Sequence, residues 1–212
     1  MHNPKLSVTQ AFATPSALQA AGRPRSELRA LLRSLRDTLP QRALRERGID
    51  AMLTQELHEL RAHCIGVYCA SRGEYDALAV VQRMAAAQDR SWSIALPVVR
   101  PGAGRMEFCC WRPGQALRRG AFGIDEPVDC TQVVEPDVLV LPCLGFGDDG
   151  LRLGYGGGYY DRYLEHRRVH TIGVAFDACR VEGLAAQAHD RLLDVVLTES
   201  RRYTWPLRSA TR

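Results

Sequence analysis

The sequence predicts a single α/β domain with a mostly parallel central sheet and helices on both faces, a Rossmann-like three-layer arrangement. Short apolar runs of strand length alternate along the chain with segments in which apolar residues recur at helical spacing. The length of 212 residues is typical of one domain with a substantial core. Because no internal repeat and no linker-like stretch divides the chain, we expect one folding unit.

Two helices are expected before the first strand. Leucines at helical spacing over residues 25–39 predict the first, with Ser26 as its candidate cap and Pro40 as its interruption. The second is expected over residues 49–62. Three arginines line the first helix, and we interpret Arg33 and Arg36 as part of its solvated face.

Six strands are expected, at residues 65–69, 94–99, 106–111, 138–141, 171–176 and 195–198. The third follows the second so closely that these two should pair antiparallel. A helix is expected to start at Glu74, and residues 114–123 are expected to form a loop or short turn. We assign residues 1–24 to a mobile N-terminal segment, residues 25–205 to the domain and residues 206–212 to a C-terminal tail.

Composition limits the classes of partner. The net charge of +4 is small and interleaved with acidic residues, which argues against a nucleic-acid-binding protein and suits an anionic small ligand. Lys5 is the only lysine, so a phosphate clamp must use arginine or backbone amides. Neither a membrane-spanning apolar stretch nor a secretory signal is visible, and we expect a cytoplasmic monomer.

The seven cysteines indicate neither a metal site nor a redox motif. They form no Cys-x-x-Cys pair, and most lie inside apolar runs. We therefore interpret them as small buried hydrophobic residues in a reducing cytosol.

The glycine-rich loop in residues 152–164 is the strongest functional signal. It follows an apolar strand and leads into Tyr159-Tyr160-Asp161, which reads as a helix start. Glycine allows positive φ and close approach of the backbone, and the N–H groups of a helix start attract anions. The loop lacks the Gly-Lys-Ser/Thr of a P-loop and the third glycine of the dinucleotide fingerprint. It therefore predicts a phosphate site of another kind.

Ligands of such sheets collect beyond the carboxyl ends of the strands. The glycine loop, the Ser71–Glu74 turn and the start of residues 177–183 each follow an expected strand. We expect these three segments to meet in one crevice.

Several motifs together resemble the 5-formyltetrahydrofolate cyclo-ligase family, also called methenyltetrahydrofolate synthetases. The pattern Arg-Leu-Gly-x-Gly-x-Gly-Tyr-Tyr-Asp is met at residues 152–161. Further matching pieces are Pro-Cys-Leu-Gly-Phe at 142–146, Phe-Gly-Ile-Asp-Glu-Pro at 122–127, His189-Asp190 and Leu193-Asp194. The resemblance covers about residues 25–200.

The resemblance implies an ATP- and Mg²⁺-dependent cyclisation of 5-formyltetrahydrofolate to 5,10-methenyltetrahydrofolate, with release of ADP and phosphate. The implied route transfers the γ-phosphoryl group to the formyl oxygen, forms an iminium phosphate, and closes the ring when folate N10 attacks. Such chemistry needs amides, arginines and a cation around the phosphates.

Carried over residue by residue, the resemblance implies these site residues: ATP binding by Arg25, Arg29, Arg152, Gly154, Gly156, Gly157, Gly158, Tyr159 and Tyr160; catalysis by Arg152, Tyr159 and Asp161; folate binding by Glu74, Tyr155 and Tyr159; and Mg²⁺ binding by Asp161 and Asp194. We expect one of the two adjacent tyrosines to lie in the core. A surface arginine is the alternative for Arg152, and a charge at a helix start is the alternative for Glu74 and for Asp161.

The sequence departs from the family at three phosphate-site positions. Arg25 stands where the family usually has lysine, Gly157 where many relatives have lysine, and Tyr155 where some have arginine. The alternative function is therefore a non-catalytic folate- or nucleotide-binding paralogue of the same fold. A weaker alternative, suggested by the anion loop alone, is an enzyme similar to sugar-phosphate isomerases.

Overall fold

The computed structural model describes residues 17–87 and 92–205. Within these ranges lie the α-helices α1 (Arg25–Asp37), α2 (Arg42–Glu59), α3 (Ala77–Ala86) and α4 (Tyr159–Leu164). The strands are β1 (Leu18–Gln19), β2 (Cys64–Val67), β3 (Ser93–Arg100), β4 (Arg105–Trp111), β5 (Leu117–Arg119), β6 (Asp125–Pro127), β7 (Val133–Val134), β8 (Val138–Pro142), β9 (Gly145–Phe146), β10 (Arg152–Leu153), β11 (His170–Val174), β12 (Val181–Glu182), β13 (Val195–Leu197) and β14 (Arg202–Thr204).

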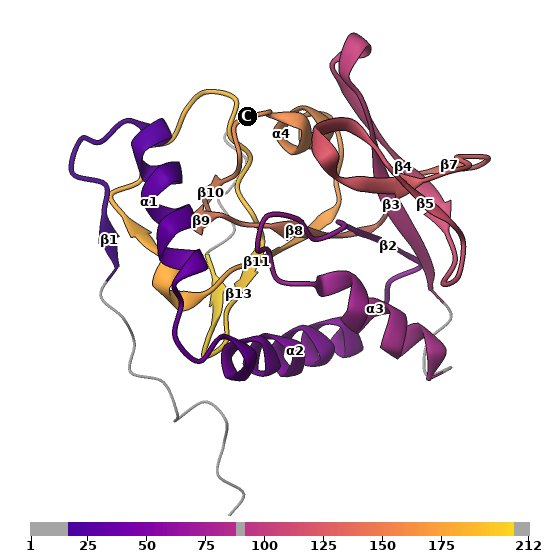
Figure 1. The fold of residues 1–212 in the computed structure, drawn as a ribbon, viewed down its shortest axis with the longest axis horizontal. Coiled ribbons are helices and arrows are strands. Elements are labelled where there is room, and N and C mark those ends of the chain that lie inside the picture. Colours follow the sequence, from indigo (N-terminus) through magenta and orange to yellow (C-terminus); the bar gives the residue numbers. More distant parts are fainter. Residues whose placement is uncertain (1–16, 88–91, 206–212) are drawn as a thin grey trace, which may run out of the picture.

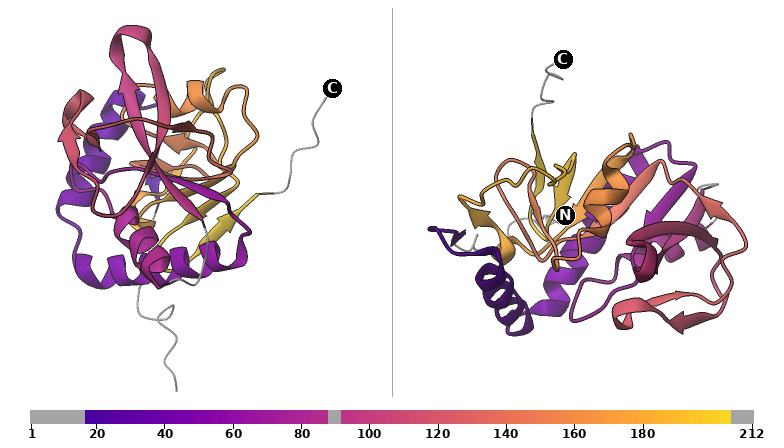
Figure 2. Two further views of the ribbon diagram at one scale, coloured as in Figure 1. Left: turned by 90° about the vertical axis from the view of Figure 1, so that its right-hand side faces the viewer. Right: turned by 90° about the horizontal axis from the view of Figure 1, so that it is seen from above.

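The main sheet has eight strands in the order β14-β13-β11-β8-β2-β3-β4-β7. The five consecutive strands from β13 to β3 are parallel. Strand β14 at one edge, and β4 and β7 at the other, are antiparallel to their neighbours. The expected α/β class and the expected antiparallel pair, β3 with β4, are therefore confirmed. Figure 2 shows the β3–β4 hairpin projecting beyond the rest of the domain.

Alternating side chains of the central strands build a core on each face of the sheet. Val138 and Val140 of β8 belong to the core shared with α1, α2 and α3. Leu139 and Leu141 belong to the core on the opposite face, shared with α4. Because each face is covered, the central parts of the parallel strands are apolar on both faces, as two-sided burial favours, and all five residues of β8 are buried. Figure 1 shows α2 and α3 along one side of the sheet and α4 on the other.

Two helix starts differ from the expected ones. The second helix begins at Arg42, because Gln41 adopts a left-handed conformation with φ of 54° and turns the chain directly after Pro40. Helix α3 begins at Ala77, where the side chain of Asp76 accepts a hydrogen bond from the N–H of Ala79 at 3.2 Å. Glu74 is therefore not at a helix start, and its alternative interpretation as a helix-start charge was wrong.

Short strands account for the other differences. Residues 114–123, expected as a loop, contain β5, which pairs with β6 in a separate hairpin. Strand β1 pairs with β12 inside a segment for which we expected no regular element. Residues 1–16 and 206–212, which make up most of the expected N-terminal segment and the whole expected tail, lie outside the described residues. Within the described ranges, no helix is long and apolar enough to cross a membrane.

Two cysteines differ from their expected state. Cys109 of β4 and Cys130, which precedes β7, form a disulfide with their Cα atoms 5.3 Å apart. The other five are free thiols, of which Cys69, Cys143 and Cys179 are buried. The interpretation of every cysteine as a reduced thiol was therefore wrong for this pair, which the strand β4 and the returning loop bring together.

Candidate active site

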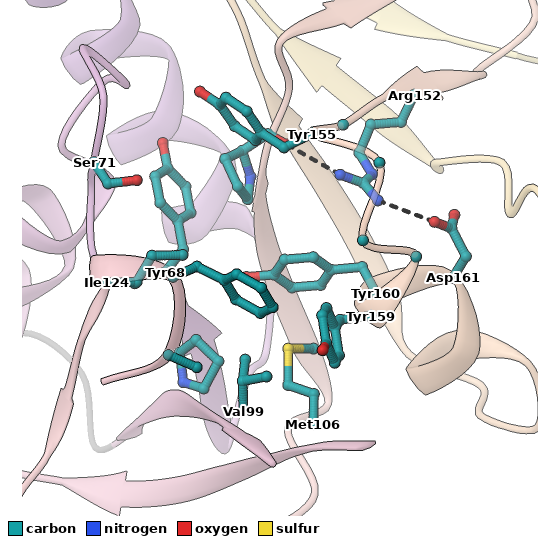
Figure 3. A pocket seen from close by; sticks show the side chains of 18 of the residues that line it. Tyr68, Ser71, Val99, Met106, Ile124, Arg152, Tyr155, Tyr159, Tyr160 and Asp161 are labelled. Atoms are coloured by element: carbon teal, nitrogen blue, oxygen red, sulfur yellow. Dashed lines mark hydrogen bonds and ion pairs between the residues drawn. The ribbon is translucent and has the colours of Figure 1, made fainter. Parts of the chain in front are cut away.

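A cavity of about 280 Å³ lies where several of the predicted site residues meet. Its walls come from the N-terminal part of α1, the segment after β2, the ends of the β3–β4 hairpin, the glycine loop with the start of α4, and the loop before β13. Figure 3 shows Arg152 and Asp161 on one side, Tyr68 and Ser71 on the other, and Tyr160 between them. The cavity thus lies beyond the carboxyl ends of β2 and β8, as α/β folds favour.

Two glycines give the loop its shape. Gly156 has a φ of 97° and Gly158, directly before α4, a φ of 66°, both in the left-handed region. A Cβ atom on Gly156 would also lie 3.3 Å from the guanidinium carbon of Arg29. Residues with side chains adopt this conformation less readily, so glycine is strongly favoured at these two positions.

Arg152 lies under the loop and is only 9% exposed, which excludes the surface alternative. Its Nη1 donates to the backbone oxygen of Pro142 at 3.3 Å, and its Nη2 to Oδ2 of Asp161 at 3.5 Å. The guanidinium carbon also lies 5.3 Å from the ring centre of Tyr160. The loop therefore has a buried positive charge next to the carboxylate of Asp161.

Helix α1 brings two more arginines to the same loop. Arg29 donates from Nε to the backbone oxygen of Gly154 at 2.8 Å. Burial, together with the nearby charges of Arg25 and Arg33, lowers the pKa of Arg29. Arg25 lines the cavity too, but its guanidinium pairs with Asp190, at 2.9 Å from Nη1 to Oδ1, and with the backbone oxygen of Ala185 at 2.8 Å. Arg25 therefore reaches the site already paired.

Glu74 faces the cavity from the turn after β2. Its Oε2 accepts hydrogen bonds from the backbone N–H of Ser71 at 2.8 Å and from the Ser71 hydroxyl at 3.2 Å. Burial raises the pKa of Glu74, and hydrogen bonds from Ser71 and Tyr155 with the charge of Arg36 oppose that rise. Burial raises the pKa of Tyr155 to about 12, so its phenol stays protonated and can donate.

Both adjacent tyrosines line the cavity. Tyr159 and Tyr160 are each half-buried, so the expectation that one of them lies in the core was wrong. Tyr159 is flanked by the guanidinium of Arg162, 4.8 Å from its ring centre, and by the ring of Phe122 at 5.6 Å. Both rings also pack against the core on the α4 face of the sheet, so neither is fully buried in it.

An apolar wall faces these polar groups, and our site prediction did not include it. Its members are Val99, Met106, Phe122 and Ile124. Phe122 and Ile124 belong to a motif that carries the family resemblance, so this signal was present in the sequence. Val99 and Met106 belong to apolar strands, and only their place at the hairpin end brings them to the cavity.

Asp194 lies away from this site, and its expected pairing with Asp161 was wrong. It directly precedes β13, and its Oδ2 accepts hydrogen bonds from the N–H and the hydroxyl of Thr171 at 2.8 and 2.7 Å. Thr171 is near the start of β11, so both residues lie at the amino ends of parallel strands. Asp161 lies beyond the carboxyl ends, at the opposite edge of the sheet.

Two other expectations also fail. Asp177 is buried and hydrogen-bonds with the side chains of Ser200 and Glu199, so residues 177–183 do not line the cavity. The loop carrying Gln187 and Asp190 lines it instead.

Arg36, expected on a solvated face, is 2% exposed. Its burial could have been predicted from its spacing, since it follows the buried Leu28 and Leu32 at intervals of four residues.

The donor set fits a Mg²⁺ ion only if phosphate contributes to it. Within the described ranges there is no group of three or more acidic, histidine or cysteine ligands. Asp161 lines the cavity with a side chain 16% exposed, and its contact with Arg152 leaves carboxylate lone pairs available. One carboxylate with substrate phosphates and waters is a common Mg²⁺ environment. Asp161 therefore fits as a sole protein ligand.

Comparison with known proteins gives one consistent result. A model described as the 5-formyltetrahydrofolate cyclo-ligase family matches residues 20–199. The 5-formyltetrahydrofolate cyclo-ligase of Escherichia coli K12 is 34% identical over 68% of this chain and 82% of its own length. That of Haemophilus influenzae is 28% identical over 82% of this chain and 97% of its own.

Solved structures agree in fold. The NMR structure of Aquifex aeolicus 5,10-methenyltetrahydrofolate synthetase superposes with a TM-score of 0.70 and 28% identity, covering 89% of this chain and 95% of that one. A 5,10-methenyltetrahydrofolate synthetase from Mycoplasma pneumoniae has a TM-score of 0.66 at 21% identity, covering 82% and 98%.

Proposed function

This chain belongs to the 5-formyltetrahydrofolate cyclo-ligase family, and we propose that it catalyses the ATP-dependent conversion of 5-formyltetrahydrofolate to 5,10-methenyltetrahydrofolate. The observation that carries the proposal is the composition of the cavity. A glycine loop with Arg29 and Arg152 forms one part of its wall, and apolar residues with Glu74 form another. Such a cavity suits a phosphate-bearing and a ring-bearing substrate side by side.

The arginines and loop amides would hold the nucleotide phosphates. The backbone at Gly156 and Gly158 can approach an anion closely, and Arg152 and Arg29 place two positive charges behind it. Asp161 would hold Mg²⁺, which offsets phosphate charge during phosphoryl transfer. Arg25, already paired with Asp190, would act mainly by fixing α1 against the site.

The folate would lie along Val99, Met106, Phe122 and Ile124, with the carboxylate of Glu74 facing the polar edge of its pterin ring. Tyr155 and Tyr159 would border the space between the two substrates. The formyl oxygen would then receive the γ-phosphoryl group, and N10 would displace phosphate from the resulting iminium phosphate. The protein's contribution is to hold these atoms in line and exclude water.

The direct test is turnover. Protein mixed with 5-formyltetrahydrofolate and Mg-ATP should produce the near-ultraviolet absorption band of the methenyl product, and omission of ATP should abolish it. Folate or ATP binding without that band would favour the non-catalytic paralogue, for which the absence of lysine from the loop is the specific observation. A protein that neither binds nor converts the folate would contradict both the catalytic function and the non-catalytic alternative.

Asp161→Asn tests the expected role of the single carboxylate. We expect the fold to be retained with a lower melting temperature, because the buried Arg152 loses a charged partner, and we expect a loss of most activity, because an amide is a poor Mg²⁺ ligand. Asp148→Asn is a suitable control, since Asp148 pairs with Arg180 outside the cavity. Near-normal turnover of Asp161→Asn at ordinary magnesium concentrations would mean that Asp161 only complements the helix start.

A further inference from the structure

Arg36 is a buried cation whose position the proposed function leaves unexplained. It lies near the end of α1 and is 2% exposed, and among the described residues no carboxylate forms an ion pair with it. Burying a guanidinium is costly unless its donors are satisfied. Its hydrogen bonds therefore indicate what it is positioned to do.

Those hydrogen bonds join two segments of the cavity wall. Nη2 of Arg36 donates to the hydroxyl oxygen of Tyr155 at 2.6 Å, and also to the backbone oxygen of Arg72. Tyr155 belongs to the glycine loop, and Arg72 to the turn that ends in Glu74. The guanidinium carbon also lies 5.8 Å from the centre of the Tyr155 ring. One side chain thus links α1, the glycine loop and the Ser71–Glu74 turn.

The same helix contacts the nucleotide side of the site two turns earlier. Arg29 holds the backbone of Gly154, seven residues before Arg36 and on the same side of α1. Helix α1 therefore fixes the phosphate loop with one arginine and the Tyr155–Glu74 region with another. This arrangement sets the distance between the two halves of the cavity.

We propose that Arg36 is a positioning residue for the folate half of the site, acting through the Tyr155 hydroxyl and the Ser71–Glu74 turn to orient the Glu74 carboxylate. The inference rests on the proposed function, because it takes reduced folate as the ligand that Glu74 faces. Arg36 itself does not line the cavity in which the two substrates are proposed to bind.

Electrostatics at Glu74 support this role. The groups that face Glu74 are Arg36 from α1, Ser71 from its own turn, Tyr155 from the loop, Tyr68 after β2, Tyr160 of α4 and Cys143 after β8. Arg36 is the cation among them that acts on the carboxylate, whereas Arg42 of α2 contacts the same turn through the backbone oxygens of Gly73 and Glu74. Tyr155 accepts from Arg36, and both the phenol and the guanidinium lower the pKa of Glu74 against the effect of burial, so the three groups are electrostatically coupled. Removing Arg36 should free that phenol to rotate.

The test compares Arg36→Met with Arg33→Met, an exposed arginine on the same helix. Dissociation constants for 5-formyltetrahydrofolate are measured by calorimetry, and KM values for both substrates by turnover. For Arg36→Met we expect folate binding about 10- to 100-fold weaker, the usual effect of losing a charge-assisted hydrogen bond, with the KM for ATP changed less than about threefold. Arg36→Lys should recover part of the loss, and Arg33→Met should change neither constant.

Tyr155→Phe makes the test independent of whether Arg36→Met folds. This variant keeps the ring and removes the hydroxyl that accepts the hydrogen bond from Arg36, and it should weaken folate binding in the same direction. Because the two residues act in series, the double variant should bind folate about as weakly as Arg36→Met alone. Three results would overturn the proposal and leave Arg36 a structural residue. The losses of folate affinity in the two single variants could add up in the double variant, Tyr155→Phe could bind folate as tightly as the wild type, or Arg36→Met could weaken folate and ATP binding equally. A wild type that binds folate without turnover would overturn the proposed function alone, whereas one that does not bind folate would overturn both.

Discussion

At the scale of the single residue, Glu74 combines a cost to stability with a role in binding. Burial raises its pKa, so the charged form is less favourable in the folded chain than in the unfolded chain. Below the unfolded-state pKa this penalty is absent, and it grows as the pH rises through the folded-state pKa. Glu74→Gln should therefore melt at a higher temperature than the wild type at neutral pH, and the difference should shrink in acid.

The same substitution should weaken folate binding, because the amide lacks the negative charge of the carboxylate. Thermal melts and calorimetry across the acidic to neutral range would measure both effects. Glu135→Gln is a matched control, since the Glu135 side chain is 76% exposed. A lower melting temperature for Glu74→Gln at neutral pH would mean that Ser71 and Arg36 more than offset the cost of burial.

Residue chemistry predicts the site only where local sequence also fixes position. Arg152, Asp161 and the glycines lie within ten residues of one another, so their motif brings them together without knowledge of the sheet. The predicted pairing of Asp194 with Asp161 was wrong because a residue just before a strand lies at the amino edge of a parallel sheet. The prediction that Arg36 is exposed was wrong because an arginine was assumed to be solvated, although its spacing from Leu28 and Leu32 places it on the buried face of α1.

At the scale of the element, the glycine loop needs left-handed backbone at defined positions. Gly156→Ala should cost roughly 1–2 kcal/mol in backbone conformation and push the Arg29 guanidinium away, which a Cβ atom would approach to 3.3 Å. We expect several-fold weaker ATP binding with cooperative unfolding retained. Gly102→Ala is the control, because its Cβ would meet no atom within 4 Å and its φ is not positive. Equal ATP affinity in both variants would place the nucleotide elsewhere.

The start of α1 is fastened by one ion pair. Arg25 and Asp190 have side chains only 14% and 6% exposed, so removal of either partner leaves the other buried without its counter-charge. Arg25→Ala should destabilise the protein by about 1–3 kcal/mol and raise the KM for ATP. A double-mutant cycle with Asp190→Ala, read by chemical denaturation, should yield a coupling of similar size. Additive losses would mean that the two residues act separately.

Elements with strong periodicity were predictable and short ones were not. The apolar strands are recognisable in the sequence because both of their faces are buried. Helix α1 is recognisable because one whole stripe of its residues is buried. The β5–β6 hairpin consists of three-residue strands, and β5 is exposed throughout, so its sequence shows no alternation. The hairpin region nevertheless carries Phe122 and Ile124 to the cavity, and together with Val99 and Met106 these residues form the wall that the site prediction did not include.

At the scale of the whole molecule, the Cys109–Cys130 disulfide ties this region to the sheet. The bond joins residues 21 positions apart and encloses the chain from β5 to β6, including Phe122 beside Tyr159. A cross-link of this span restricts the unfolded chain and typically contributes about 2–4 kcal/mol. It should also limit how far the Phe122 segment moves from the cavity.

Cys130→Ser should therefore lower the melting temperature of oxidised protein and raise the KM for the folate, with a smaller effect on ATP. Treating the wild type with a dithiol should reproduce both changes, and the variant should not respond further. Cys110→Ser is the control, because Cys110 neighbours the bond in β4 but remains a free thiol. Intact-mass measurement before and after reduction establishes the bonded state. The dithiol could instead leave the melting temperature and the folate kinetics of oxidised wild-type protein unchanged. That result would mean that the sheet and hairpin hold Phe122 in place without the bond.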